Sequence, residues 1–275
     1  MSPYSIGQLA NRLYVSGYPT SQIFKYDFSR PLGLRQEPPN PRRIGWAGKA
    51  DAGDMHVPLT GTVGAADGRV YTAGCTVGRR REGGGFGWYD TKTCQDDGMS
   101  LDEHRIFWIA TAPDGRYVLM SSKRQGKGML LCWDTRKHEF VYKKEILEQP
   151  TPGPIVEALP GGLVIGHTTA PGDQGGTLYG LKADTGELPW TKRVRIGPVT
   201  AFSRVRRHAY SYRRGPDGRI WSFFDNTLVR IDPVDGKVEA VGRVPDHPVQ
   251  IAFAAGHVYA AGSGHPRRVK GLRTD

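Results

Sequence analysis

One segment, residues 204–214, carries cationic and titratable side chains at alternate positions. The residues at even positions are Arg204, Arg206, His208, Tyr210, Tyr212 and Arg214. In a β-strand they share one face, because successive side chains point to opposite sides. An unpaired guanidinium is costly to bury, whereas apolar groups gain from burial. This face must therefore meet acidic side chains, water or an anionic ligand.

The segment is open to three interpretations. As a catalytic or binding site, Arg206 would neutralise a substrate carboxylate, His208 and Tyr210 would transfer protons, and Arg204 and Tyr212 would contact the ligand. As a structural feature, it would form a ladder of ion pairs between neighbouring sheets, with Glu157 or Asp225 as partners. It could also stack single-stranded nucleic acid, but nothing else in the chain resembles a nucleic-acid module.

The chain contains a repeated strand-and-turn pattern, described below. Four of the eight histidines lie at a similar place in it, 10 to 13 residues before a strand that the repeats share. Neutral imidazoles bind metals and titrate near neutrality, so these residues could form a ligand-binding or acid–base cluster. The alternative is a set of loop histidines that face water or neighbouring sheets. Since no metal-ligand spacing accompanies them, we predict no metal site. The four are His56, His104, His208 and His247.

The repeat is clearest at residues 228–237, a strand followed by a turn that begins at Asp232 and ends at Gly236. Each copy has apolar residues one and four positions before the turn, on opposite faces of the strand, which predicts burial on both sides. The fifth turn position calls for a positive φ, which glycine adopts without strain. Cys94 and His138 occupy it in two copies, so those turns could be built differently. The turns begin at Asp27, Asp90, Asp134, Lys182 and Asp232.

A second strand precedes each of these, often after an Asp-Gly pair, a strong hairpin signal. Copies lie about 38 to 57 residues apart, a period typical of β-propeller blades. We therefore predict an all-β fold, a single β-propeller domain over residues 1–275 with about six four-stranded blades. The last blade lacks a clear fourth strand, so either the N-terminus completes it or the chain is part of a larger, for example seven-bladed, propeller. The predicted blades are 4–48, 57–100, 104–148, 152–196, 198–244 and 247–275.

Two of the repeats resemble known propeller families. Residues 178–190, with Thr185-Gly186 in the turn and Trp190 after it, look like a pyrroloquinoline-quinone-type repeat with its docking tryptophan. Residues 217–233 look like a streptogramin-lyase blade. The resemblance implies a propeller that binds a ligand, or a lyase, or a quinone-dependent dehydrogenase. Only one repeat has the docking tryptophan, and a convincing cofactor and Ca²⁺ set is missing, so the dehydrogenase ranks last.

Composition narrows the choice of partner. The formal net charge is +11, which favours anionic partners, although an arginine-rich genome would give the same charge. No apolar run is long enough to span a membrane.

Three cysteines without a spacing pattern argue against a disulfide framework and for a reducing compartment. No signal peptide is visible, so the chain as written is expected in the cytoplasm, unless a targeting segment belongs to a longer gene product.

These observations predict a propeller that recognises an anionic ligand, such as an acidic carbohydrate, on a basic face. The first alternative is a polysaccharide or streptogramin-type lyase that uses Arg206, His208 and Tyr210. The sequence leaves the cofactor, the ligand and the oligomeric state undetermined.

Overall fold

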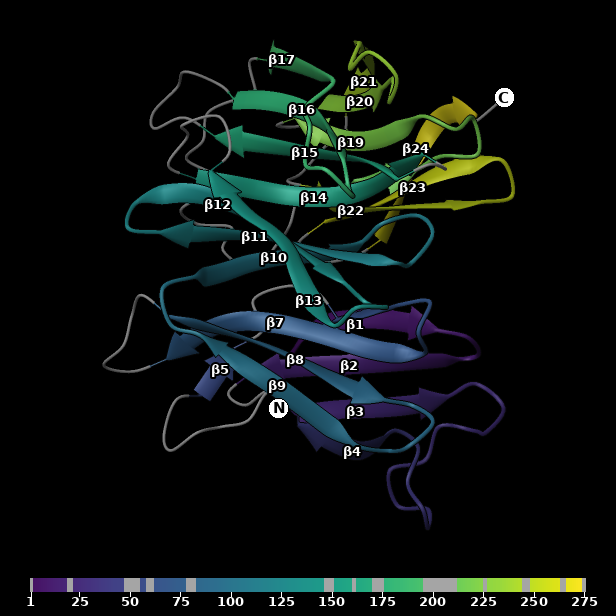
Figure 1. Ribbon diagram of the computed structural model, residues 1–275. Coiled ribbons are helices and arrows are strands. Elements are labelled where there is room, and N and C mark those ends of the chain that lie inside the picture. The colour runs from purple at the N-terminus through teal and green to yellow at the C-terminus, as the bar shows by residue number, and fades with distance from the viewer. Residues whose placement is uncertain are drawn as a thin grey trace. The chain divides into compact units, whose positions relative to one another are not determined.

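The fold consists of antiparallel sheets joined in chain order (Figure 1). The computed structural model describes residues 2–18, 22–46, 55–57, 62–77, 83–145, 151–159, 162–169, 176–194, 212–224, 227–243, 248–262 and 266–273. These residues contain strands and turns and no helix, which confirms the all-β prediction. Accordingly, none of the described segments is a helix that could span a membrane.

The contacts divide the chain into two units, residues 1–152 and 153–275, which are described separately. The single-domain prediction stays a prediction. The first unit holds three sheets. Sheet 1 contains β1 (Ser2–Leu9), β2 (Arg12–Tyr18), β3 (Gln22–Asp27) and β4 (Arg42–Trp46). Sheet 2 contains β5 (Met55–Val57), β6 (Thr62–Gly64), β7 (Arg69–Val77), β8 (Gly84–Asp90) and β9 (Asp96–Leu101). Sheet 3 contains β10 (Arg105–Thr111), β11 (Tyr117–Arg124), β12 (Lys127–Asp134) and β13 (Glu139–Glu145).

The second unit also holds three sheets. Sheet 4 contains β14 (Thr151–Leu159), β15 (Leu163–Thr169), β16 (Gly176–Lys182) and β17 (Trp190–Val194). Sheet 5 contains β18 (Arg213–Arg214), β19 (Ile220–Phe224), β20 (Thr227–Ile231) and β21 (Val238–Arg243). Sheet 6 contains β22 (Pro248–Ala254), β23 (His257–Gly262) and β24 (Pro266–Arg273), so three of its strands are described.

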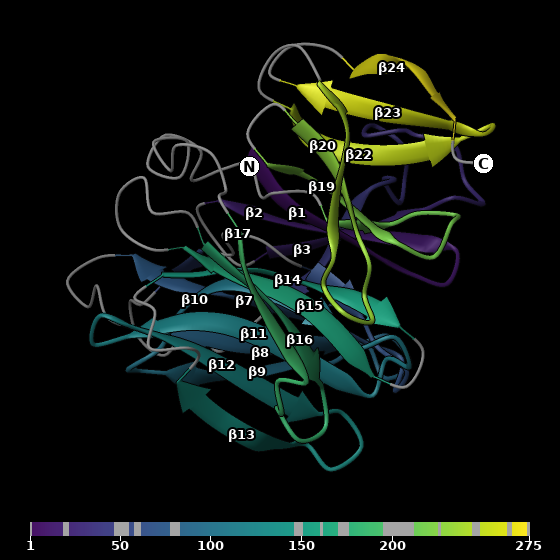
Figure 2. The same ribbon diagram turned by 90° about the horizontal axis from the view of Figure 1, so that it is seen from above.

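Each described sheet is a meander in which the strand order follows the chain (Figure 2). The strands predicted before the repeated turns are β3, β8, β12, β16 and β20. In sheet 2, two short strands, β5 and β6, both pair with β7. The N-terminal strand β1 pairs with β2 as the first strand of sheet 1.

The core lies between neighbouring sheets. Sheets 2 and 3 share a cluster built around Tyr71, Phe86, Met120 and Trp133. In the second unit, one cluster joins sheets 4 and 5 and another joins sheets 5 and 6. The strand β12 contributes buried side chains to both faces, as the repeat predicted, and β19 is buried on both faces too. No sheet of this kind can cover its own apolar surface, so each depends on its neighbours.

The turns follow the predicted mechanism. In the Asp-Gly turn of sheet 5, the Asp217 carboxylate accepts the Arg219 backbone N–H at 3.1 Å, and Gly218 has a φ of +75°. In the longer turn that follows, Asp232 accepts the Val234 N–H at 2.9 Å. Carboxylates at these positions therefore hold the backbone of the turns by bonds to N–H groups two residues on.

The suggestion that Cys94 and His138 mark differently built turns is wrong. The N–H of each donates to the carbonyl four residues back at 2.9 Å, and the φ angles are +60° and +56°. The same bond and sign of φ occur at Gly236. The remaining bonds of the turn thus hold a non-glycine residue in the left-handed region, a strain of about 1–2 kcal/mol.

Trp190 docks onto the turn of the next sheet. Its indole N–H donates to the Pro233 carbonyl at 3.1 Å. A Cβ added at Gly236 would lie 2.5 Å from the six-membered part of the ring, and one added at Gly180 would lie 2.5 Å from the indole nitrogen. Glycine at both positions therefore makes room for the indole between sheets 4 and 5.

Two glycine variants separate backbone strain from this docking. Gly218 and Gly236 both have positive φ, but a Cβ at Gly218 meets nothing within 4 Å. We expect Gly218→Ala to lower the free energy of unfolding by about 1 kcal/mol. Gly236→Ala should lower it by at least about 1 kcal/mol more, because its Cβ displaces Trp190. Denaturant unfolding of both variants measures the difference, and equal losses would contradict the docking role of the indole.

Candidate functional site

Most of the predicted basic site falls outside the described residues. This applies to Arg204, Arg206, His208 and Tyr210, and also to His247. The described part of the segment is its last three residues, Tyr212 and the short strand β18. That strand is the first of sheet 5 and lies at its edge, pairing with β19.

Tyr212 faces the neighbouring sheet. Its side chain is 2% exposed, and its hydroxyl lies 2.7 Å from Nδ1 of His167 on β15. Burial lowers the pKa of His167 to about 3, so the imidazole is neutral at pH 7. A neutral imidazole can accept the phenol proton at Nδ1. Tyr212 thus takes part in a hydrogen bond between sheets 4 and 5, whereas the predicted ion-pair partners Glu157 and Asp225 do not contribute to this contact.

A similar bond joins two sheets of the first unit. The Ser16 hydroxyl on β2 lies 2.6 Å from the Thr62 hydroxyl on β6, and both side chains are buried. Ser16 and His167 are each the fifth residue of the second strand of their sheet. Sequence analysis missed this joint, because the two partners are 46 residues apart. The sequence did offer one signal of this bond, a polar residue at the fifth position of the second strand of the sheet.

Arg213 and Arg214, in contrast, are both exposed. No hydrogen bond or ion pair of either side chain is found in the part of the chain that the structure describes. Within the described residues, no acidic side chain neutralises the charges of Arg213 and Arg214. The described residues combine a buried structural tyrosine with two exposed guanidinium groups on one edge strand.

The predicted histidine cluster can be traced in part. His104 lies just before β10 and is 6% exposed, with Nδ1 3.2 Å from the Ser122 hydroxyl. Burial, followed by the charges of Lys143 and Arg124, lowers its pKa. His56 lies within β5, opposite Thr76 of β7. Both positions are at or next to the first strand of their sheets. Among the described residues no group of three or more His, Cys, Asp or Glu side chains could hold a metal ion.

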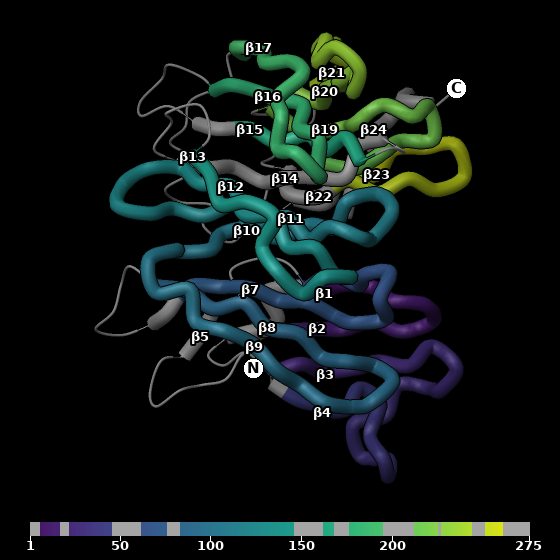
Figure 3. The backbone as a smooth tube through the Cα atoms, in the orientation of Figure 1, coloured from purple at the N-terminus to yellow at the C-terminus, as the bar shows by residue number. Residues whose placement is uncertain are grey.

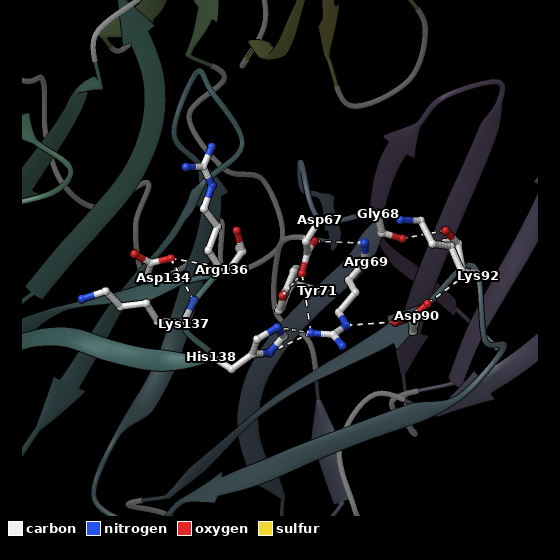
Figure 4. A network of polar contacts seen from close by, with 12 residues as sticks. Asp67, Gly68, Arg69, Tyr71, Asp90, Lys92, Asp134, Arg136, Lys137 and His138 are labelled. Atoms are coloured by element: carbon white, nitrogen blue, oxygen red, sulfur yellow. Dashed lines mark hydrogen bonds and ion pairs between the residues drawn. The ribbon is translucent and has the colours of Figure 1, made fainter.

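A network of polar contacts joins the turns of sheets 2 and 3 (Figure 4). Arg69 lies at its centre, with Nε 3.2 Å from the Asp90 carboxylate and Nη1 3.7 Å from that of Asp67. Nη1 also lies 2.7 Å from Nδ1 of His138. The Tyr71 hydroxyl donates to Asp67 at 2.6 Å, and burial together with this carboxylate raises the pKa of Tyr71.

The same carboxylates also fix the turns. Asp90 accepts backbone N–H groups of Lys92 and Thr93, which lower its pKa. Asp134 binds the equivalent N–H groups of the next turn and the Arg116 guanidinium at 2.9 Å. Since the acidic groups are committed to arginines and to the backbone, this network holds the turns in place and leaves little free charge for a ligand.

The comparisons with known proteins give the fold. No family model matches the chain, and no curated protein matches it. Among solved structures, Kuenenia stuttgartiensis hydrazine synthase is similar over 100% of this chain and 85% of that chain, with 13% sequence identity and a TM-score of 0.69. The β-propeller domain of Myceliophteria thermophila Cps50 (Swd1) is similar over 96% of this chain and 80% of that one, with 12% identity and a TM-score of 0.60.

The protein is a β-propeller. This confirms the predicted fold class, and the sheets described above are its blades. At such low identity the likeness establishes the fold alone. The number of blades and the resemblance to quinoprotein and streptogramin-lyase propellers stay predictions.

The buried His167 makes the stability of this propeller depend on pH. Its pKa is about 3 in the folded state and about 6.5 when unfolded. The unfolded chain therefore binds more protons below pH 6.5, and stability falls as the pH falls from 6.5 toward 3, by about 1.4 kcal/mol per unit for one group. His104, whose pKa is also lowered, adds in the same direction.

We expect His167→Gln to flatten this dependence, because the amide can accept the Tyr212 hydroxyl but does not titrate. Free energies of unfolding measured by denaturant at pH 7, 6 and 5 should fall less steeply in the variant than in the native protein. The same slope in both proteins would show that His167 is not a neutral, buried group.

Proposed function

We propose that this β-propeller binds an anionic ligand of the acidic-carbohydrate class through the basic first strand of sheet 5. The exposed pair Arg213 and Arg214 carries the proposal. In the turns of sheets 2 and 3, by contrast, Arg69 and Arg116 pair with carboxylates. Here the described residues offer no acidic partner, so the guanidinium groups are available to a carboxylate or sulfate.

The sequence extends the run of positive charge. By strand alternation Arg204 and Arg206 share a face with Arg214, and His208 and Tyr210 lie between them. The net charge of +11 favours approach of an anion by long-range attraction. A ligand with repeated charges, such as a uronic-acid or sulfated polymer, would engage several arginines at once, so its affinity should fall with added salt.

A lyase reaction at the same place is the alternative. Arg206 would stabilise the substrate carboxylate, while His208 and Tyr210 would remove and supply protons. The position of Trp190 supports the resemblance to a quinoprotein repeat, because the indole docks one blade on the next. That role is structural, so it favours the repeat family without favouring a dehydrogenase activity.

The binding proposal predicts a selective effect of the arginine pair. Arg213→Ala/Arg214→Ala should weaken binding to heparin or polygalacturonate by about 5- to 30-fold, which corresponds to roughly 1–2 kcal/mol of lost ion pairing. Neutral dextran should not bind. Calorimetry or surface-immobilised polymer at low and high salt measures the affinity, and thermal unfolding checks that the variant is folded.

The matched control is Arg136→Ala/Lys137→Ala, which removes two cations from a turn of sheet 3. An equal loss of affinity in this control would mean that net charge alone drives binding, and the proposal would fail. Ultraviolet absorbance from new unsaturated ends, followed in the same mixtures, tests the lyase. Its appearance in the native protein and loss in Arg206→Ala would favour the enzyme.

A further inference from the structure

The connection between β3 and β4, residues 28–41, forms an ordered projection beyond sheet 1 (Figure 3). It is held by Asn40, which is 2% exposed. The Asn40 side chain accepts the Asp27 backbone N–H at 2.9 Å and donates to the carbonyls of Asp27, Arg30 and Pro31 at 3.0 to 3.1 Å. A single buried amide therefore fixes both ends of the connection.

The interior of the projection is also bonded. Gly33 and Asn40 exchange backbone hydrogen bonds of 2.9 and 3.0 Å. The Arg30 guanidinium donates to the Pro38 carbonyl at 2.7 Å. These bonds join the two arms of the loop, so its shape is set before any partner arrives.

The projection exposes large apolar side chains. Leu32 is 71% exposed and Leu34 is 74% exposed, with only Gly33 between them. Phe28, at the base, is 47% exposed. Two neighbouring leucines on a projecting loop cover far less area than a stable protein interface, which needs roughly 800 Å² on each partner. Two exposed leucines on a convex tip can instead insert into the apolar layer of a lipid bilayer.

The sequence of the projection and its base is rich in cations. Residues 28–43 contain Arg30, Arg35, Arg42 and Arg43 but one acidic residue, Glu37. Arg42 begins β4 directly opposite Lys25 on β3, so two like charges face each other across the sheet. Such pairs are unfavourable unless an anion neutralises them.

The charges at the base confirm this surplus. Burial, and then the charges of Arg42 and Arg12, lower the pKa of Lys25. Asp27 is the nearby carboxylate, but it already bonds Ser29 and lies 3.4 Å from Arg12, and these contacts keep its pKa at about 2. The base of the projection thus has more positive than negative charge.

We propose that residues 28–43 dock the protein onto a membrane surface rich in anionic phospholipid, with Leu32 and Leu34 entering the interface and the surrounding arginines and Lys25 contacting the headgroups. The apolar tip matches the acyl-chain region of such a membrane, and the positively charged residues below it match the anionic headgroups. These residues differ from those of the basic strand of sheet 5, so the proposal does not depend on the proposed carbohydrate binding.

Vesicle sedimentation tests the proposal. The full chain should bind phosphatidylcholine vesicles containing about 30% phosphatidylserine and not vesicles of phosphatidylcholine alone. Leu32→Ala/Leu34→Ala should weaken binding at least about 10-fold, because each alanine removes apolar groups from the interface. Arg35→Ala/Arg42→Ala should weaken it about 5-fold or more and leave it less sensitive to salt.

Two controls make the result specific. Val234 is 72% exposed on a turn of sheet 5, so Val234→Ala removes an equally exposed apolar side chain elsewhere and should leave binding unchanged. Arg213→Ala/Arg214→Ala should also bind vesicles normally, which separates this surface from the carbohydrate site.

Several results would overturn the proposal. One is equal binding to neutral and anionic vesicles, and another is unchanged binding of the leucine variant. If sedimentation velocity showed that the native protein self-associates and the leucine variant does not, the occupant of the tip would be a second copy of the chain. Binding of soluble polyglutamate as tight as that of vesicles would favour an acidic protein.

Discussion

The burial of both faces of each central strand governs this structure. A strand such as β12 has buried side chains along nearly its whole length, so its sheet needs a neighbour on either side. The clusters between sheets 2 and 3 and between sheets 4 and 5 meet that need with aromatic and branched residues. Buried polar side chains add hydrogen bonds between neighbouring sheets, from Ser16 to Thr62 in the first unit and between Tyr212 and His167 in the second.

The turn carboxylates have a second, local role. Asp90 and Asp134 each hold a backbone turn and an arginine at the start of the neighbouring strand, Arg69 in β7 and Arg116 directly before β11, so one side chain links the turn to that strand. This explains how Cys94 and His138 can remain in the left-handed region. The strain at one residue is small against the set of bonds that surrounds it.

The sequence predicted the repeating hairpins well, because their signals are local. The Asp-Gly pairs and the apolar residues on both faces of residues 228–231 depend on neighbours within a few positions. It did not predict the bond of Tyr212 to His167, since residues 45 positions apart meet only when the sheets are stacked. Alternation placed Tyr212 on the same face as the arginines, but alternation does not say what covers that face. The chemistry expected of Arg206, His208 and Tyr210 lies outside the described residues and stays a prediction.

The buried hydrogen bonds between Ser16 and Thr62 and between Tyr212 and His167 affect which sheets can pack beside each other. At equivalent strand positions, Ser16 meets the small side chain of Thr62, whereas His167 meets the large ring of Tyr212. An exchange of the first and fourth hairpins would set serine beside a phenol and imidazole beside a threonine, leaving one gap and one clash. Blades with a similar backbone fold are therefore not interchangeable, and buried side chains help to set which blade packs beside which.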